Sequence, residues 1–184
     1  MKILGLDGSP RKNGNTEKLV RAVLEGAAEK GTEAEFHKLA KEKISPCLGC
    51  IGCRETGVCV INDDMQRLYA RIQDSDAIVI GSPVYLWQVT AQTKVFMDRL
   101  LPFLAPDYST RLTGKKRLVF AFTQGNPDRH AFETYFDYLA KLFGFLRFDV
   151  KGHIAAVGTR NIDDIVKQAD VMEKAREMGR SLVS

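Results

Sequence analysis

Short apolar runs alternate with amphipathic patterns along this chain, and the alternation restricts the fold more than any other feature. Between the runs, apolar residues recur every three or four positions, as on one face of a helix. Neighbouring parallel strands need crossover connections, so this order predicts an α/β fold with a parallel sheet and helices on both faces. The five strand-like runs are Ile3–Leu6, Glu33–Leu39, Asp76–Gly81, Leu118–Phe122 and one within Phe145–Val157.

The helices of this fold are expected in the intervals between the strands. Asn62 has the character of a helix N-cap, with Asp63 and Asp64 in the first turn. Carboxylates there offset the helix dipole, and we prefer this interpretation to acid–base catalysis. The other predicted helices run from about Thr16 to Lys30, Val89 to Leu104, around Phe132–Phe143, and Ile162 to Val183.

Composition places the chain among ordinary globular proteins. Its 184 residues are 45% hydrophobic and 27% charged, which predicts one domain over residues 1–184. The net charge of +4 is mild and the basic residues are scattered, so nucleic-acid binding is not implied. No apolar run approaches the roughly 20 residues needed to cross a bilayer. The first strand begins at once, without a secretion signal, so we expect a cytoplasmic protein with reduced cysteines.

The segment between the first strand and the first helix predicts an anion site. Free N–H groups at a helix start and the helix dipole both favour a phosphate there. Neither the dinucleotide fingerprint nor the triphosphate-binding P-loop matches the spacing of its glycines, so a monophosphate fits best. A polar turn that only starts a helix is the alternative. The candidate ligand groups are Ser9, Arg11, Asn13, Asn15 and Thr16.

Two further loops follow the third and fourth strands and belong to the same edge of a parallel sheet. Pro83, Val84, Tyr85, Leu86 and Trp87 form the first of these loops. Its aromatic rings can cover a flat ligand, although packing in the core is the alternative for both. The second loop offers backbone and polar groups for the rim of such a ring. It contains Thr123, Gln124 and Gly125.

With these three loops the chain resembles the flavodoxin-like NAD(P)H-dependent FMN reductase superfamily. The resemblance rests on Gly8-Ser9-Pro10-Arg11 with Asn15-Thr16, on Gly81-Ser82-Pro83-Val84-Tyr85, and on Lys94 with Asp98-Arg99. It implies a three-layer sandwich around a five-stranded parallel sheet of order 2-1-3-4-5. It also implies that the first loop binds the FMN phosphate and the other two bind the isoalloxazine ring.

The same resemblance extends to assembly and to the helix after the aromatic loop. Members of the superfamily commonly form homodimers that complete each other's flavin sites, often as homotetramers. Lys94, Asp98 and Arg99 are then expected to be structural or to lie at a subunit contact rather than to be catalytic.

All four cysteines lie in one Cys-rich loop at 44–62. Cys47, Cys50, Cys53 and Cys59 have a spacing related to that of ferredoxins, and they bring the chain closest to the iron–sulfur flavoproteins. That resemblance implies a 4Fe–4S cluster that exchanges electrons with FMN. A zinc site, redox-active thiols and cysteines without any bound group are the alternatives.

The function expected from these features is an FMN-dependent oxidoreductase in which the flavin carries the chemistry. With a cluster, electrons pass between the cluster and FMN, and a ferredoxin is the expected donor. Without a cluster, NAD(P)H reduces FMN, which then reduces a quinone, a flavin or another small-molecule acceptor. A non-catalytic electron carrier of the flavodoxin type is the main alternative, followed by a binding module that has lost the cofactor.

Overall fold

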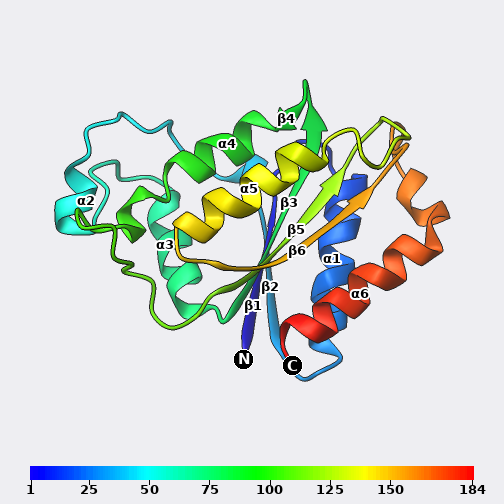
Figure 1. The fold of residues 1–184 in the computed structure, drawn as a ribbon, viewed down its shortest axis with the longest axis horizontal. Helices are drawn as coiled ribbons and strands as arrows, with labels where there is room; N and C mark the ends of the chain where they lie inside the picture. The colour runs from blue at the N-terminus through cyan, green and yellow to red at the C-terminus, as the bar shows by residue number, and fades with distance from the viewer.

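The structure is a computed structural model that describes residues 1–184. Its centre is a parallel sheet with the strand order β2-β1-β3-β5-β6 (Figure 1). Counted along the chain, the five parallel strands have the order 2-1-3-4-5, so the predicted topology is confirmed. The strands are β1 (Lys2–Asp7), β2 (Glu33–Lys38), β3 (Ala77–Tyr85), β5 (Arg117–Thr123) and β6 (Asp149–Ala156), and β4 (Gln88–Val89) pairs antiparallel with the end of β3.

Helices cover both faces of the sheet, as the alternating pattern predicted (Figure 1). Side chains along each strand point alternately to the two faces, so Leu118 and Phe120 join one apolar cluster and Val119 joins the other. None of the helices is both long and apolar enough to span a lipid bilayer. The helices are α1 (Asn15–Ala28) and α6 (Ala169–Leu182) on one face, α3 (Met65–Asp74), α4 (Ala91–Asp98) and α5 (Glu133–Phe145) on the other, and a short α2 (Gly52–Thr56) in the Cys-rich loop.

The largest error of the sequence-based prediction concerns the segment after Gly81. We expected the third strand to end there, but β3 continues to Tyr85 and turns back as β4. The two-residue turn consists of Leu86 and Trp87, with φ of 44° and 66°. Two consecutive left-handed residues are typical of the turn that matches the twist of a tight hairpin. Such turns usually contain Asn or Gly, whereas both turn residues here are apolar, and the sequence therefore did not predict the hairpin.

The boundaries of three helices also differ from the prediction. The helix expected over 89–104 begins at Ala91, where the Thr90 side chain caps it, and ends at Asp98; a 3₁₀ turn, Leu101–Phe103, follows. The last helix begins at Ala169 instead of Ile162, because residues 164–167 form a separate 3₁₀ turn. Asp64 precedes the first residue of α3, so Asn62 is not its N-cap.

Candidate functional site

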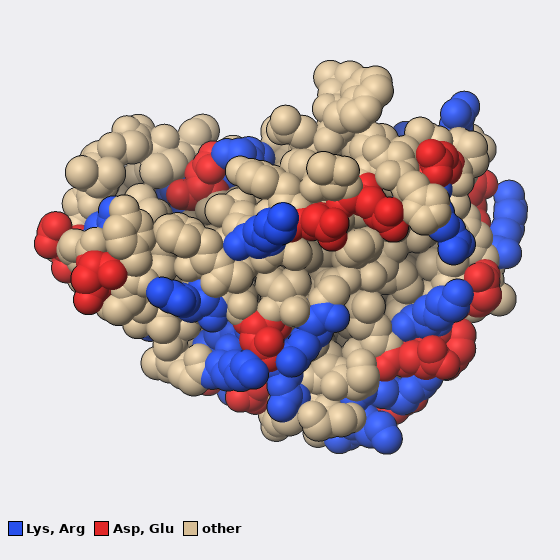
Figure 2. Space-filling view, in the orientation of Figure 1, with Lys and Arg blue, Asp and Glu red and all other residues tan.

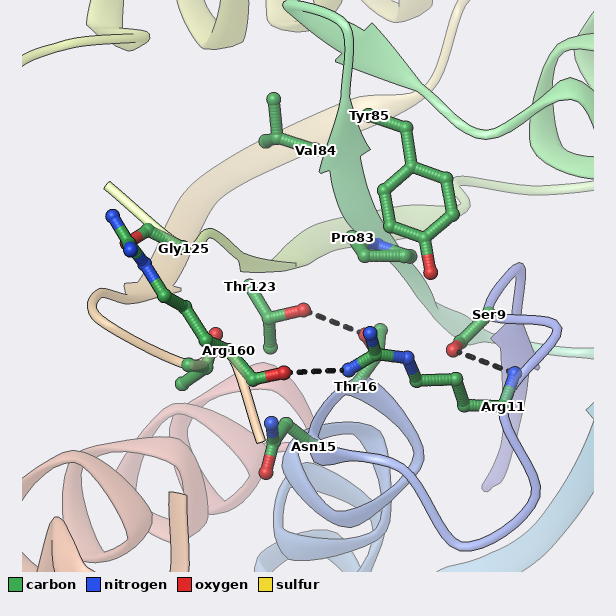
Figure 3. Close-up of a pocket in the computed structure, with 11 residues that line it drawn as sticks. Ser9, Arg11, Asn15, Thr16, Pro83, Val84, Tyr85, Thr123, Gly125 and Arg160 are labelled. Atoms are coloured by element: carbon green, nitrogen blue, oxygen red, sulfur yellow. Dashed lines mark hydrogen bonds between the residues drawn. The ribbon is translucent and has the colours of Figure 1, made fainter. Parts of the chain in front are cut away.

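A polar cavity of about 260 Å³ opens where β1, β3 and β5 end (Figure 3). Only two of the eleven residues that line it are hydrophobic. All three loops predicted to bind a phosphorylated ring contribute to it. The predicted residues in its wall are Ser9, Arg11, Asn15, Thr16, Pro83, Val84, Tyr85, Thr123 and Gly125, and the structure adds Thr159 and Arg160.

Free backbone donors gather on the cavity's first loop. Helix α1 begins at Asn15 after Gly14, which has no side chain to cap it. Within the chain, the N–H groups of Lys12, Gly14, Asn15 and Thr16 have no hydrogen-bond acceptor. Such groups at the positive end of a helix dipole form a site for an anion. The predicted phosphate loop therefore has the donors that it requires.

Hydroxyl and amide side chains tie this loop to the strands around it. Thr16 and Thr123 share a buried hydrogen bond of 2.7 Å between their hydroxyls. The Asn15 side chain donates to the carbonyl of Asn161 at 2.8 Å and accepts from the N–H of Ile165 at 3.2 Å. Asn15 thus joins the start of α1 to the loop after β6, and both ends of its amide are engaged.

Two arginines lie across the mouth of the cavity. Arg11 donates from Nη1 to the Arg160 carbonyl at 2.8 Å, and Arg160 donates from Nε to the Gly125 carbonyl at 3.1 Å (Figure 3). Both side chains are exposed and can move to meet a ligand. Sequence reasoning missed Thr159 and Arg160, although the fifth strand must also end at this edge and its polar loop could have indicated them.

Four of the predicted ligand residues lie outside the cavity wall. Leu86 and Trp87 are 89% and 72% exposed at the tip of the β3–β4 hairpin. Asn13 is exposed, and its N–H donates to the Glu17 carboxylate. Gln124 is buried beneath the loop; its amide nitrogen donates to two carbonyls, whereas its Oε1 has no partner. The Tyr85 ring, by contrast, points from the hairpin toward the loop of Ser9 and Arg11 (Figure 3).

A buried ion cluster lies against the first loop, and sequence analysis did not identify it. Lys38, at the end of β2, donates from Nζ to Asp7 at 2.7 Å and to Glu17 at 3.1 Å. Burial raises the pKa of Asp7. Burial alone would lower the pKa of Lys38, but the two carboxylates outweigh it and raise that pKa. The cluster joins β1, β2 and α1 beneath the loop.

The four cysteines lie close together but do not converge on one point. Cys47 and Cys50 are exposed, Cys59 is half-buried and Cys53 is buried at the start of α2; all four are free thiols. Burial and then the neighbouring thiols raise the pKa of Cys53. No three Cys, His, Asp or Glu side chains are placed to hold one metal ion. The Gly49 N–H lies 3.4 Å from the Cys47 Sγ, as donors near cluster ligands do.

Arg99 ties both ends of this Cys-rich loop to the body of the protein. Only 1% of its surface is exposed. Its Nη1 donates to the Ser45 carbonyl and to the Asp63 carboxylate, each at 2.7 Å, and its Nη2 donates to the Ile61 carbonyl at 3.4 Å. Asp63 also accepts the N–H of Met65 at 3.0 Å, as expected at a helix start. Its ion pair with Arg99 was not foreseen.

An apolar groove of about 460 Å³ lies between α4 and α5, away from the polar cavity. Nine of its twelve lining residues are hydrophobic. Lys94 and Asp98 line it and form an ion pair with each other on α4. Figure 2 shows basic and acidic side chains interspersed over the visible face, without a continuous patch of one sign.

Comparisons with known proteins agree with this arrangement. A sequence profile described as NADPH-dependent FMN reductase matches residues 1–159. An iron–sulfur flavoprotein of Methanocaldococcus jannaschii is 47% identical over 102 residues, which are 55% of this chain and 53% of that protein. One from Methanosarcina thermophila is 42% identical over 54% of this chain and 52% of that protein. The matches thus span about half the length of these curated relatives.

Longer but weaker likenesses cover nearly the whole chain. A putative NAD(P)H-dependent FMN-containing oxidoreductase of Bacillus subtilis is 25% identical over 97% of this chain and 96% of its own. Among solved structures, the NAD(P)H:quinone oxidoreductase from Methanothermobacter marburgensis superposes with a TM-score of 0.78 at 19% identity. That superposition covers 100% of this chain and 98% of the other, and it supports the fold.

Proposed function

Because the chain belongs to the NADPH-dependent FMN reductase family, we propose that residues 1–184 form one FMN-binding domain that acts as an oxidoreductase. The observation that carries the proposal is the polar cavity, which the start of α1, with its free N–H groups, lines together with the ends of β3 and β5. Free backbone donors, which suit an anion, thus lie beside an aromatic hairpin. A phosphorylated flavin has the chemical groups to match both.

The proposal gives each loop a part of the ligand. Ser9, Arg11 and the first turn of α1 bind the phosphate, with Asn13, Asn15 and Thr16 beside them. The segment Pro83–Trp87 and the segment Thr123–Gly125 hold the ring and offer hydrogen bonds to its polar edge. FMN, when bound, supplies hydride and single-electron chemistry. The chain's own residues bind, orient and shield it.

Titration and steady-state kinetics test the proposal together. FMN added to the apoprotein is expected to bind at one site per chain, with quenching of flavin fluorescence. Oxidation of NADH or NADPH in the presence of an artificial acceptor then distinguishes an enzyme from a carrier, because a flavodoxin-type carrier shows almost no turnover. Absence of FMN binding by the correctly folded protein contradicts the proposal.

For Cys47, Cys50, Cys53 and Cys59 we propose a 4Fe–4S cluster as their bound group. The relatives named iron–sulfur flavoproteins, the four thiols within one short segment and the Gly49 N–H near Cys47 support it. Four thiols are the usual ligands of such a cluster. Because they do not converge in the structure, their side chains must move to surround it. A cytoplasmic location, where thiols stay reduced, and a ferredoxin as electron donor complete this part of the proposal.

Anaerobic purification followed by iron, sulfide and flavin analysis tests the cluster. About four irons per flavin are expected. Iron-free protein from a strictly anaerobic preparation supports the second candidate function, an NAD(P)H-linked reductase of FMN and small acceptors such as quinones. The full-length similarity to the FMN-containing oxidoreductase of Bacillus subtilis favours that alternative.

The groove between α4 and α5 supports a homodimer, with a homotetramer as the larger alternative. Its predominantly apolar lining suits contact with a second copy of the chain. Light scattering coupled to size-exclusion chromatography measures the assembly. Replacement of Leu142 in the groove by Glu is expected to shift the protein toward the monomer, and unchanged mass contradicts this interface.

A further inference from the structure

Beyond the residues that line the cavity, we infer that Lys38 is a positioning residue for the phosphate loop. Its ammonium group fixes the loop from the side remote from the cavity and so directs loop N–H groups toward the bound phosphate. The inference rests on the proposed FMN site. It assigns a binding role to a side chain that contacts no ligand.

The contacts of Lys38 reach the loop both directly and through two carboxylates. Nζ donates to the Arg11 carbonyl at 2.7 Å. Asp7, which Lys38 also contacts, accepts the N–H of Ser9 at 2.9 Å, and Glu17 accepts the N–H of Asn13 at 3.1 Å. Three backbone groups at alternate positions of the loop are therefore held by one buried cluster.

The bond to the Arg11 carbonyl sets the direction of the next peptide N–H. In a trans peptide the C=O and the following N–H point in opposite directions, and the chain has no cis peptide bonds. With the Arg11 carbonyl held by Lys38, the Lys12 N–H points away from β2. The cavity lies on that other side, against β3 and β5; Arg11 lines its wall and Lys12 adjoins it in the chain, with an N–H that has no acceptor within the chain.

Charge and burial explain why a lysine stands at this position. Lys38 and Asp7 are both buried, at 8% and 0% exposed, and Glu17 is buried beside them. Without the ammonium group, two carboxylates would remain together away from water, at a considerable free-energy cost. The same ion pairs that make the loop rigid before it binds a ligand reduce the entropy lost on binding.

The test compares FMN with riboflavin, which has the same ring but no phosphate. The informative variant is Lys38→Met with Asp7→Asn, because it removes one positive and one negative charge together. Asn at position 7 still offers an oxygen to the Ser9 N–H. We expect the dissociation constant of FMN to rise about tenfold, and that of riboflavin by less than about twofold. Lys38→Met alone is expected to act in the same direction with lower stability.

Lys116→Met is the matched control. Lys116 is also buried, at 4% exposed, and its Nζ donates to the carbonyls of Gln73 and Ser75. These residues precede β3, at the edge of the sheet opposite to the cavity. Removal of the Lys116 ammonium group is expected to leave the ratio of the FMN and riboflavin constants unchanged. The inference is overturned if both constants rise equally in the double variant, if the FMN constant does not change there, or if Lys116→Met changes the ratio as much as the double variant does. Failure of the unaltered protein to bind FMN instead contradicts the proposed function itself.

Discussion

Replacement of Arg99 by Met is the most demanding test of the contacts that hold the Cys-rich loop. The substitution keeps an unbranched but shorter side chain and removes the guanidinium group with all of its N–H donors. The carbonyls of Ser45 and Ile61 and the carboxylate of Asp63 then lose the hydrogen bonds that Arg99 gives them. Since Arg99 is almost fully buried, water cannot readily replace its donors.

Breaking a buried ion pair by removing one partner costs about 3–5 kcal/mol. Asp63 retains the N–H groups of Ser45 and Met65, at 2.8 and 3.0 Å, so the lower end of that range is expected. A domain of this size loses roughly 2–4 °C of Tm per kcal/mol, and Arg99→Met is therefore expected to lower Tm by about 10 °C. Arg67→Met is the control, because Arg67 is exposed and its ion pairs with Asp64 and Glu42 lie at the surface; it is expected to cost less than about 1 kcal/mol.

Urea denaturation of Arg99→Met, Asp63→Asn and the double variant measures the coupling between the two side chains. The double variant is expected to be more stable than the sum of the single losses predicts, because neither charge remains unpaired. A loss below about 1 kcal/mol for Arg99→Met, or strict additivity, would refute the reasoning. Faster alkylation of the buried Cys53 in native Arg99→Met protein is the accompanying local signal, and an unchanged rate contradicts the role of Arg99 in holding the loop.

The ion pair also predicts a dependence on pH. Burial opposes ionisation of Asp63, but the Arg99 guanidinium and the N–H donors of Ser45 and Met65 outweigh it and hold its pKa below the ordinary value. Because this pKa is lower in the folded state, the ionised Asp63 stabilises the protein above the unfolded pKa of about 4. That stabilisation is lost as the pH falls further. Arg99→Met is expected to lose part of this acid sensitivity. Identical acid-unfolding profiles for the two proteins would contradict the pairing.

Three further predictions concern other parts of the fold. Trp87, the only tryptophan, is exposed beside the proposed ring site; Trp87→Ala is expected to weaken FMN binding about fivefold in a fluorescence titration, and unchanged affinity excludes ring contact. Burial lowers the pKa of His153, which packs against Phe136. Its neutral form therefore stabilises the protein above about pH 6.5, and His153→Phe is expected to flatten the loss of Tm between about pH 7 and pH 5. Gly26→Ala would push a Cβ into the Arg176 carbonyl where α1 meets α6, with a cost of about 1–3 kcal/mol by thermal denaturation, whereas no loss would show that the helices can separate freely.

The parallel sheet and the position of the cavity followed from periodic patterns in the sequence, whereas the strand order followed from the family resemblance. Five alternations of strand and helix leave few topologies, and the carboxyl ends of parallel strands share one edge. The hairpin at Leu86 and Trp87 did not follow, since its left-handed residues are not the usual ones. Local patterns describe what a segment prefers by itself, and this turn is imposed by the pairing of Tyr85 with Gln88.

The sequence also did not predict the buried ion pairs, because their partners lie far apart along the chain. Lys38 reads as one polar position in a half-exposed strand, and nothing local indicates that Asp7 and Glu17 surround it in the fold. The separation of Arg99 from Ser45 and Asp63 along the chain likewise conceals their contact. A sequence motif identifies residues of the loops that can contact a ligand. The buried side chains that support those loops are recognised only when the packing of the elements is known.

Each of the buried cations holds one of the two proposed cofactor segments through its backbone. Lys38 binds the phosphate loop at Arg11, and Arg99 binds the Cys-rich loop at Ser45 and Ile61. Each donates to backbone carbonyls, which most changes of side chain in the loop leave in place. The body of the protein can therefore hold each loop while the exposed side chains of the loop remain free for the ligand. Rigidity and binding are thereby assigned to different residues, which is why substitution of a buried cation should change affinity without removing any ligand contact.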